Sequence, residues 1–172
     1  MSRYAPPSTF SYSLGPGPIT PAVKWIILAN VAVFVATFFF AEPVRYYFGL
    51  IPQFVIEKGW FWQLGTYMFL HADPMHILLN MLGVWMFGVT LERRWGTTFF
   101  TKYYAITGLG AGLTALLVSL LPFEATRPAY DSATIGASGA LFRLLVAFAI
   151  YYPHQPILLM LLFPIPARIF VM

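Results

Sequence analysis

The sequence has no cysteine and few charged residues. Among its 172 residues 9% are Asp, Glu, Lys or Arg, whereas 59% are hydrophobic. The absence of cysteine excludes disulfides, thiolate catalysis and Cys-ligated metal sites. Soluble domains average about 25% charged residues, and a short chain must expose much of its surface. Ten basic and six acidic side chains cannot cover that surface, so the composition excludes a soluble globular domain and predicts an integral membrane protein.

A basic patch interleaved with aromatic residues is also absent, so the net charge of +4 does not indicate nucleic-acid binding. The basic residues instead predict an orientation, because cationic loops stay in the cytoplasm. The N-terminal side and the even-numbered loops hold six of them: Arg3, Lys24, Arg93, Arg94, Lys102 and Arg168. The opposite side holds three: Arg45, Lys58 and Arg127. We therefore expect a multi-pass protein with a cytoplasmic N-terminus, in a bacterial inner membrane.

Helix-length apolar runs follow a tail, 1–21, that is rich in Pro, Ser and Gly. A membrane span needs about 20 apolar residues. The runs that qualify are 22–41, 74–91, 99–121 and 135–152. The connection 42–73 carries Trp60, Trp62 and Tyr67, a mixture typical of a segment in the bilayer interface. Four prolines in 153–166 break any later helix, and a fifth span only opens at Arg168. The expected fold is all-α: a polytopic helical bundle with about four transmembrane helices and a C-terminal stub.

Polar groups inside a bilayer are costly, so those in the predicted spans are candidate functional residues. The second span begins His71-Ala-Asp-Pro-Met-His76-Ile-Leu-Leu-Asn80, which places His76 and Asn80 on one helix face. The fourth span begins Gly136-Ala137-Ser138-Gly139 on the same side of the membrane. We therefore expect a serine and a His/Asn face at one depth. Backbone N–H groups, the Asn80 amide and the His76 ring could there stabilise an oxyanion.

Each feature has a simpler interpretation when it is taken alone. A serine flanked by glycines in an apolar helix is often close helix packing, and a His–Asn pair is often an interhelical hydrogen bond. Their order along the chain and their common depth favour a site.

The combination resembles the rhomboid family of intramembrane serine proteases. The resemblance rests on HxxxxHxxxN, on Glu92-Arg93-Arg94-Trp95-Gly96 and on GASG, and it implies that residues 22–172 form a partial rhomboid-like transmembrane domain. It implies that Ser138 is the nucleophile, that His76 and Asn80 stabilise the oxyanion, and that His71 supports the site. Glu92 would fix the inner end of the second span. No cofactor is implied.

The resemblance also identifies two departures from the family. Rhomboids use a histidine on a later helix as the base for the serine, and this chain is truncated before that helix. His154 lies sixteen residues after Ser138, roughly 24 Å along a helix, so it cannot be the base. Arg143 stands where the family pattern has a small residue that packs against the missing helix.

Three functions follow from these observations. The leading hypothesis is a degenerate, non-proteolytic rhomboid that serves as an accessory subunit of a membrane complex. Its integral membrane partner would dock along the open flank near Arg143, with the bilayer as its other contact. The second hypothesis is a fragment of an active rhomboid protease that cleaves transmembrane substrates. The third is a cofactor-binding subunit in which His71 or His76 ligates haem or a chlorin.

Overall fold

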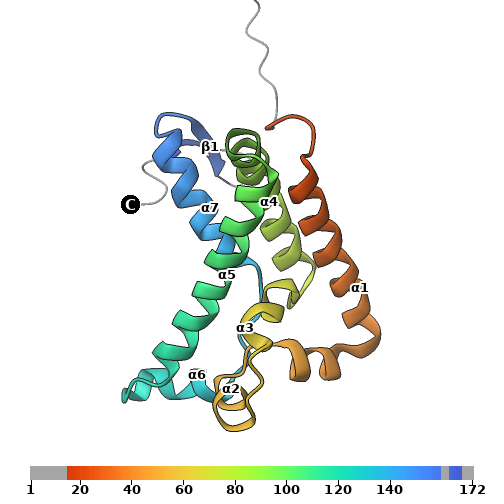
Figure 1. Ribbon diagram of the computed structural model, residues 1–172, viewed down its shortest axis with the longest axis vertical. Coiled ribbons are helices and arrows are strands. Elements are labelled where there is room, and N and C mark those ends of the chain that lie inside the picture. The colour runs from red at the N-terminus through yellow and green to blue at the C-terminus, as the bar shows by residue number, and fades with distance from the viewer. Residues whose placement is uncertain (1–14, 160–162, 168–172) are drawn as a thin grey trace, which may run out of the picture.

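The bundle consists of four long helices joined by short helical connections (Figure 1). The structure is a computed structural model, and it describes residues 15–159 and 163–167. The long helices are α1 (Pro21–Phe48), α4 (Pro74–Trp95), α5 (Thr97–Ser119) and α7 (Ser138–Tyr151). The connections are α2 (Pro52–Lys58), α3 (Gln63–Thr66), η1 (Tyr67–Phe69), η2 (Glu124–Thr126) and α6 (Arg127–Asp131). The chain is an all-α membrane protein, as its composition predicts.

Two helices, α1 and α4, are long and apolar enough to cross a membrane, and α7 is apolar but has 14 residues. The four long helices overlap the four expected spans, and that all four cross the bilayer stays a prediction. The last one begins at Ser138 instead of the expected Ile135. The reason is that Thr134 pairs with Leu50 in an isolated bridge, and Gly136 then adopts a positive φ of 116°. The turn before the serine is therefore extended backbone.

Helix α1 is bent. Phe40 has non-helical dihedrals (φ −137°, ψ 42°), and Pro43 follows three residues later inside the helix. Proline removes a helical hydrogen bond and clashes with the preceding turn, which accounts for the kink. Figure 1 shows the last turns of α1 running sideways from the long first part. The first part of α1 thus coincides with the first expected span, and the part after Phe40 leads into the connection 42–73.

Glu92 joins three helix ends at the other side of the bundle. Its carboxylate accepts hydrogen bonds from the backbone N–H groups of Ala22 (2.9 Å) and Val23 (3.0 Å) and from the hydroxyls of Thr20 and Thr97 (2.8 Å to the latter). The side chain is 2% exposed. Glu92 therefore caps α1 and holds the end of α4 against the start of α5, because unpaired N–H groups at a helix start favour an anion.

The connection before α4 is only partly an interfacial segment. Trp62 is exposed and donates to the Tyr47 carbonyl (2.9 Å), and its ring stacks on Trp60. Tyr67, by contrast, is 3% exposed. Tyr67 is buried because α5 and α7 cover it.

The C-terminal residues that the structure describes form a hairpin and no helix. Strand β1 (Pro156–Leu159) pairs with β2 (Phe163–Pro166) antiparallel, with Ile157 opposite Ile165. The prolines that exclude a helix here allow extended backbone. The expected stub at Arg168 lies outside the described residues.

Candidate active site

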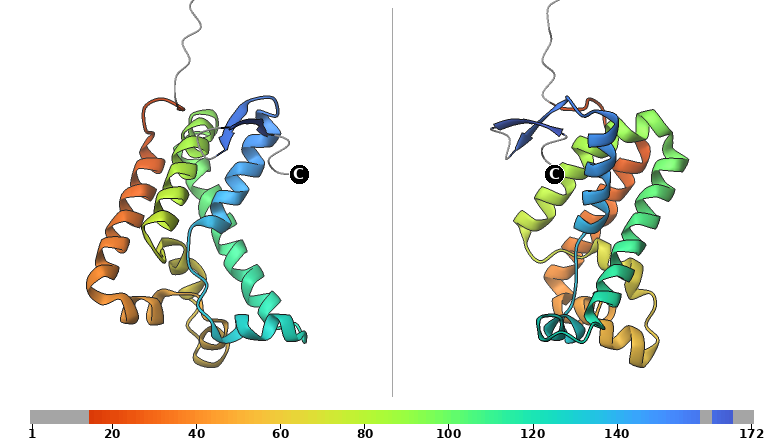
Figure 2. Two further views of the ribbon diagram at one scale, coloured as in Figure 1. Left: turned by 180° about the vertical axis from the view of Figure 1, so that it is seen from behind. Right: turned by 90° about the vertical axis from the view of Figure 1, so that its left-hand side faces the viewer.

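The candidate site lies where two helices begin at the same level. Figures 1 and 2 show that α4 and α7 both begin part-way along the neighbouring helices α1 and α5. Asp73 caps α4 by accepting a hydrogen bond from the backbone N–H of His76 (2.8 Å), and Pro74 supplies the first helical residue. The cap fixes where His76 stands on the first turn of α4, and the turn at Gly136 fixes Ser138 on the first turn of α7.

Gly136 separates His76 from Ser138. A methyl group at Gly136 would lie 2.8 Å from His76 Nε2, 3.0 Å from its Cε1 and 3.8 Å from Ser138 Oγ. One Cβ position thus touches both side chains, so the structure brings His76 and Ser138 to the same point. The positive φ of 116° and this close approach both require glycine here.

The imidazole of His76 is oriented toward the serine. Its Nδ1 accepts a hydrogen bond from the backbone N–H of Ala72 (3.3 Å), so the neutral ring carries its proton on Nε2. Because Nε2 is the atom nearest Gly136, this donor faces the turn that leads to Ser138. The oxyanion role of His76 stays a prediction.

His71 lies directly behind His76. The two ring centroids are 4.9 Å apart with planes at 70°, and His71 is 1% exposed. Neither ring nitrogen of His71 has a hydrogen-bond partner of normal geometry. Burial, and next the neighbouring His76, lower the pKa of His71 to about 4, while the backbone of Phe69 opposes this shift. His71 is therefore buried and packs against His76, and its supporting role in the site stays a prediction.

Asn80 lies one helical turn below His76 and is 5% exposed. Its Nδ2 donates to the His76 carbonyl (2.8 Å), and its buried Oδ1 has no hydrogen-bond partner. Asn80 shares the face of His76, as the four-residue spacing predicts. Its side chain is tied to its own helix and does not bond to Ser138, so the oxyanion role of Asn80 remains a prediction.

The Ser138 side chain is exposed, and its hydroxyl makes no hydrogen bond to any described residue. A serine hydroxyl is a weak nucleophile until a base takes its proton. His154 cannot serve, because it follows the far end of α7, which ends at Tyr151. Among the described residues, Ser138 thus lies near His76 but has no hydrogen-bonded base, and the nucleophile role of Ser138 stays a prediction.

Tyr67 is a site residue that the sequence analysis missed. Its carbonyl accepts the hydrogen bond of the Gly136 N–H (2.9 Å), and its hydroxyl donates to the Gly108 carbonyl on α5 (2.9 Å). The same hydroxyl lies 3.3 Å from a methyl position on Gly139. Tyr67 thus holds the turn before Ser138 against α5. The spacing of small residues, Gly108 and Gly112, could have indicated that a large side chain packs there.

Arg143 is half-buried one turn beyond Gly139. Its Nη1 donates to the Gly139 carbonyl (2.9 Å) and its own carbonyl accepts from the Tyr103 hydroxyl (3.1 Å). Burial raises the pKa of the Tyr67 phenol, and the Arg143 guanidinium opposes this shift. Within the described part of the chain, Arg143 has no carboxylate partner. The guanidinium therefore turns back along α7 toward the level of the site.

The arrangement offers little to a metal or a pigment. Among the described residues no group of three His, Cys, Asp or Glu side chains could hold a metal ion. The ring of His71 is enclosed, and Nδ1 of His76 is already bonded. Ligation of haem or a chlorin by His71 or His76 stays an untested hypothesis.

Comparison with known proteins identifies the group of proteins to which this site belongs. The Rhomboid domain family matches residues 58–172. The chain is 28% identical over 156 residues to RHOMBOID-like protein 12, mitochondrial, of Arabidopsis thaliana, covering 86% of this chain and 46% of that protein. It is 28% identical over 138 residues to Rhomboid protease AarA of Providencia stuartii, covering 73% and 49%. It is also 36% identical over 98 residues to Rhomboid protein 1, mitochondrial, of Saccharomyces cerevisiae, covering 57% and 27%.

In each case the chain spans less than half the length of the relative that it matches. The family match begins at the last residue of α2 and includes α3 to α7. It therefore contains every candidate site residue. The sequence motifs, the helical membrane fold and these similarities agree. The chain belongs to the rhomboid family.

Proposed function

We propose that this chain carries the nucleophile and the oxyanion-binding half of an intramembrane serine protease. The observation that supports the proposal is the contact at Gly136, where one methyl position would touch both His76 Nε2 and Ser138 Oγ. The similarity to a rhomboid protease of Providencia stuartii points the same way.

In the proposed reaction the Ser138 hydroxyl attacks the carbonyl carbon of a peptide bond in a transmembrane substrate. The carbonyl oxygen becomes an oxyanion, and the Ser138 backbone N–H and the His76 Nε2–H stabilise it. One such donor contributes roughly 10²- to 10³-fold to the rate. The proton of the hydroxyl goes to a base, and that base later protonates the leaving amine.

The base must come from a segment that packs on the outer face of α7. That face is open in the described residues: Ser138 is exposed on it, and Phe142, one turn further along, is 54% exposed. We propose that a helix bearing the base covers these two side chains in the active protease. A base that enters there would reach Ser138 from the side opposite α5.

The test uses the protein expressed from its complete reading frame in membranes with a transmembrane substrate. We expect cleavage, and we expect Ser138→Ala to abolish it, whereas Ser132→Ala in the exposed preceding loop should cleave normally. A fluorophosphonate probe should label the protein only when Ser138 is present. Cleavage that persists in Ser138→Ala, or an inert complete protein, contradicts the proposal.

A second candidate is the degenerate, accessory membrane subunit, and Arg143 supports it. A half-buried guanidinium without a carboxylate partner in the described residues is costly in a membrane, and a carboxylate from another subunit would reduce that cost. Native electrophoresis of solubilised membranes should then show this chain in a larger complex. Arg143→Leu should disrupt that complex, whereas the Arg143→Lys and Ser138→Ala variants should still form it. A chain that migrates alone in its native membrane contradicts this candidate.

We also propose that the N-terminal side faces the cytoplasm of a bacterial cell. Arg93 lies beside the start of α1, since it donates to the Pro18 carbonyl (2.6 Å), so its charge acts together with that of Lys24. The chain has no cysteine, so single-cysteine variants report topology cleanly. A membrane-impermeant maleimide should label Glu57→Cys from the periplasm and should not label Thr98→Cys in intact cells. The reverse pattern would invert the assignment.

A further inference from the structure

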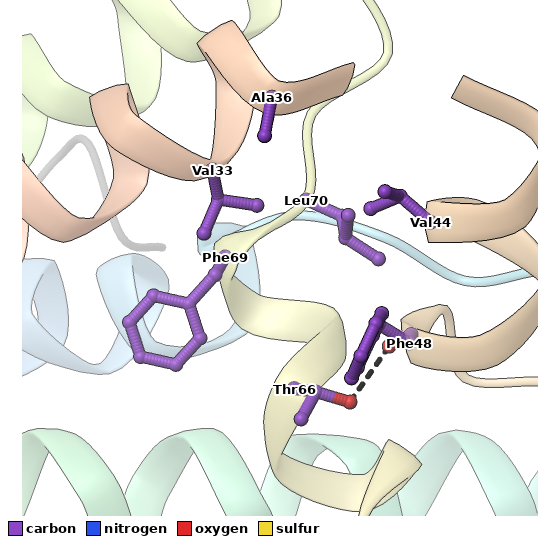
Figure 3. A pocket seen from close by; sticks show the side chains of 7 residues that line it. All are labelled: Val33, Ala36, Val44, Phe48, Thr66, Phe69 and Leu70. Carbon is purple, nitrogen blue, oxygen red and sulfur yellow. Dashed lines mark hydrogen bonds between the residues drawn. The ribbon is translucent and has the colours of Figure 1, made fainter. Parts of the chain in front are cut away.

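An apolar pocket lies in the inner angle of the α1 bend, away from Ser138. Its volume is about 340 Å³. Seven residues line it: Val33, Ala36, Val44, Phe48, Thr66, Phe69 and Leu70. Figure 3 shows their side chains converging from both arms of bent α1 and from the segment that leads to α4. We call this cavity the bend pocket.

The lining of the bend pocket has no free polar group. Thr66 is its one residue with a polar side chain, and the Thr66 hydroxyl donates to the Phe48 carbonyl (2.8 Å). A water molecule needs two to four polar partners, so an apolar cavity of this size does not hold ordered water and takes an apolar molecule. The shape and chemistry therefore suit a hydrocarbon chain and exclude a polar or charged group.

A cation stands beside this pocket. Arg45 follows Val44, a lining residue, and its Nη2 donates to the Ala72 carbonyl (3.1 Å). Among the described residues, Arg45 Nε has no hydrogen-bond partner and no carboxylate pairs with the guanidinium. Because the bond to Ala72 is exposed and uses Nη2 alone, the other end of the guanidinium is suited to bind phosphate.

The two features adjoin along α1. The pocket is lined by Val33 and Ala36 before the kink and by Val44 and Phe48 after it, on the same part of α1 as Arg45. A lipid whose phosphate lay at Arg45 could therefore place an acyl chain in the adjoining pocket. We propose that the bend pocket holds an acyl chain of an anionic phospholipid whose phosphate is bound by Arg45.

This lipid would support the site indirectly. Leu70 lines the pocket and is followed by His71, whose ring packs on His76. An acyl chain between the arms of α1 and Leu70 would fill the space behind the start of α4. The proposal does not depend on whether Ser138 is proteolytic.

The test measures lipid binding by native mass spectrometry of the chain in mild detergent, after delipidation and return of phosphatidylglycerol. We expect one tightly bound lipid. Ala36→Phe fills the pocket and should weaken binding about tenfold or more, because each methylene excluded from burial costs about fourfold in affinity. Val35→Phe is the matched control, since Val35 is the neighbouring residue, is 49% exposed and does not line the pocket.

Arg45→Gln tests the headgroup. It should lower the affinity for phosphatidylglycerol to that for phosphatidylcholine with the same chains, and it should leave phosphatidylcholine binding unchanged. A photoactivatable acyl chain should crosslink to Val44 or Phe69 in the wild type and not in Ala36→Phe. If Ala36→Phe does not fold, Val33→Phe fills the same pocket.

Three results would overturn the proposal. They are equal lipid binding by Ala36→Phe and the wild type, no preference for phosphatidylglycerol in the wild type, and a lipid-free dimer in which a second copy occupies the pocket.

Discussion

Replacing Gly136 by alanine is expected to damage the site without touching a chemical group. Gly136 has φ 116°, a conformation that L side chains rarely adopt. The added methyl would stand 2.8 Å from His76 Nε2, well inside van der Waals contact. Either His76 must leave its position or the turn before Ser138 must move.

The size of the effect follows from two terms. A residue with a side chain in left-handed backbone conformation costs about 1–2 kcal/mol, and overpacking in a well-packed region costs about 1–3 kcal/mol. Together we expect Gly136→Ala to lower the free energy of unfolding by roughly 2–5 kcal/mol. Gly110→Ala is the control, because a methyl there meets nothing within 4 Å. In a helix that change is expected to be neutral or to stabilise by about 0.5–1 kcal/mol.

The assay is unfolding by SDS in mixed micelles, followed by circular dichroism. Gly136→Ala should unfold at a lower SDS fraction than the wild type, and Gly110→Ala should not. Imidazole nitrogen NMR adds a local readout, since only Gly136→Ala should shift the His76 resonances. Equal midpoints for the two alanine variants, with an unchanged His76 spectrum, would refute the placement of Gly136 between His76 and Ser138.

Two further predictions concern buried titratable groups. Glu92→Gln leaves one of the helix-start N–H groups facing an amide NH₂, so we expect a loss of about 1–3 kcal/mol in the same unfolding assay. Glu57 is an exposed carboxylate, so Glu57→Gln should change the free energy of unfolding by less than about 0.5 kcal/mol. Equal losses in Glu92→Gln and Glu57→Gln would contradict the capping role of Glu92. His71 has a folded pKa of about 4, below the ordinary value of 6.5, so the unfolded chain binds more protons between these values. The contribution of His71 to the free energy of unfolding should be complete above pH 6.5 and be lost as the pH falls toward 4. This pH dependence of stability should weaken in His71→Phe. An identical pH dependence in the variant would refute it.

The sequence by itself determined the membrane class, the approximate helices and the family motifs. Long apolar runs and low charge leave no alternative to a bilayer, and cap residues such as Asp73 mark helix starts by local hydrogen bonds. The four-residue spacing of His76 and Asn80 places them on one face of any helix. These inferences depend on local geometry or on composition, which the chain carries in full.

Tertiary structure alone decided how distant segments meet. The contact of Gly136 with His76 depends on how α7 lies beside α4, and the burial of Tyr67 depends on the position of α5. The bend pocket likewise arises where α1 packs against the segment 66–70. Side chains take these positions because neighbouring helices exclude the alternatives, and a linear pattern does not contain those neighbours.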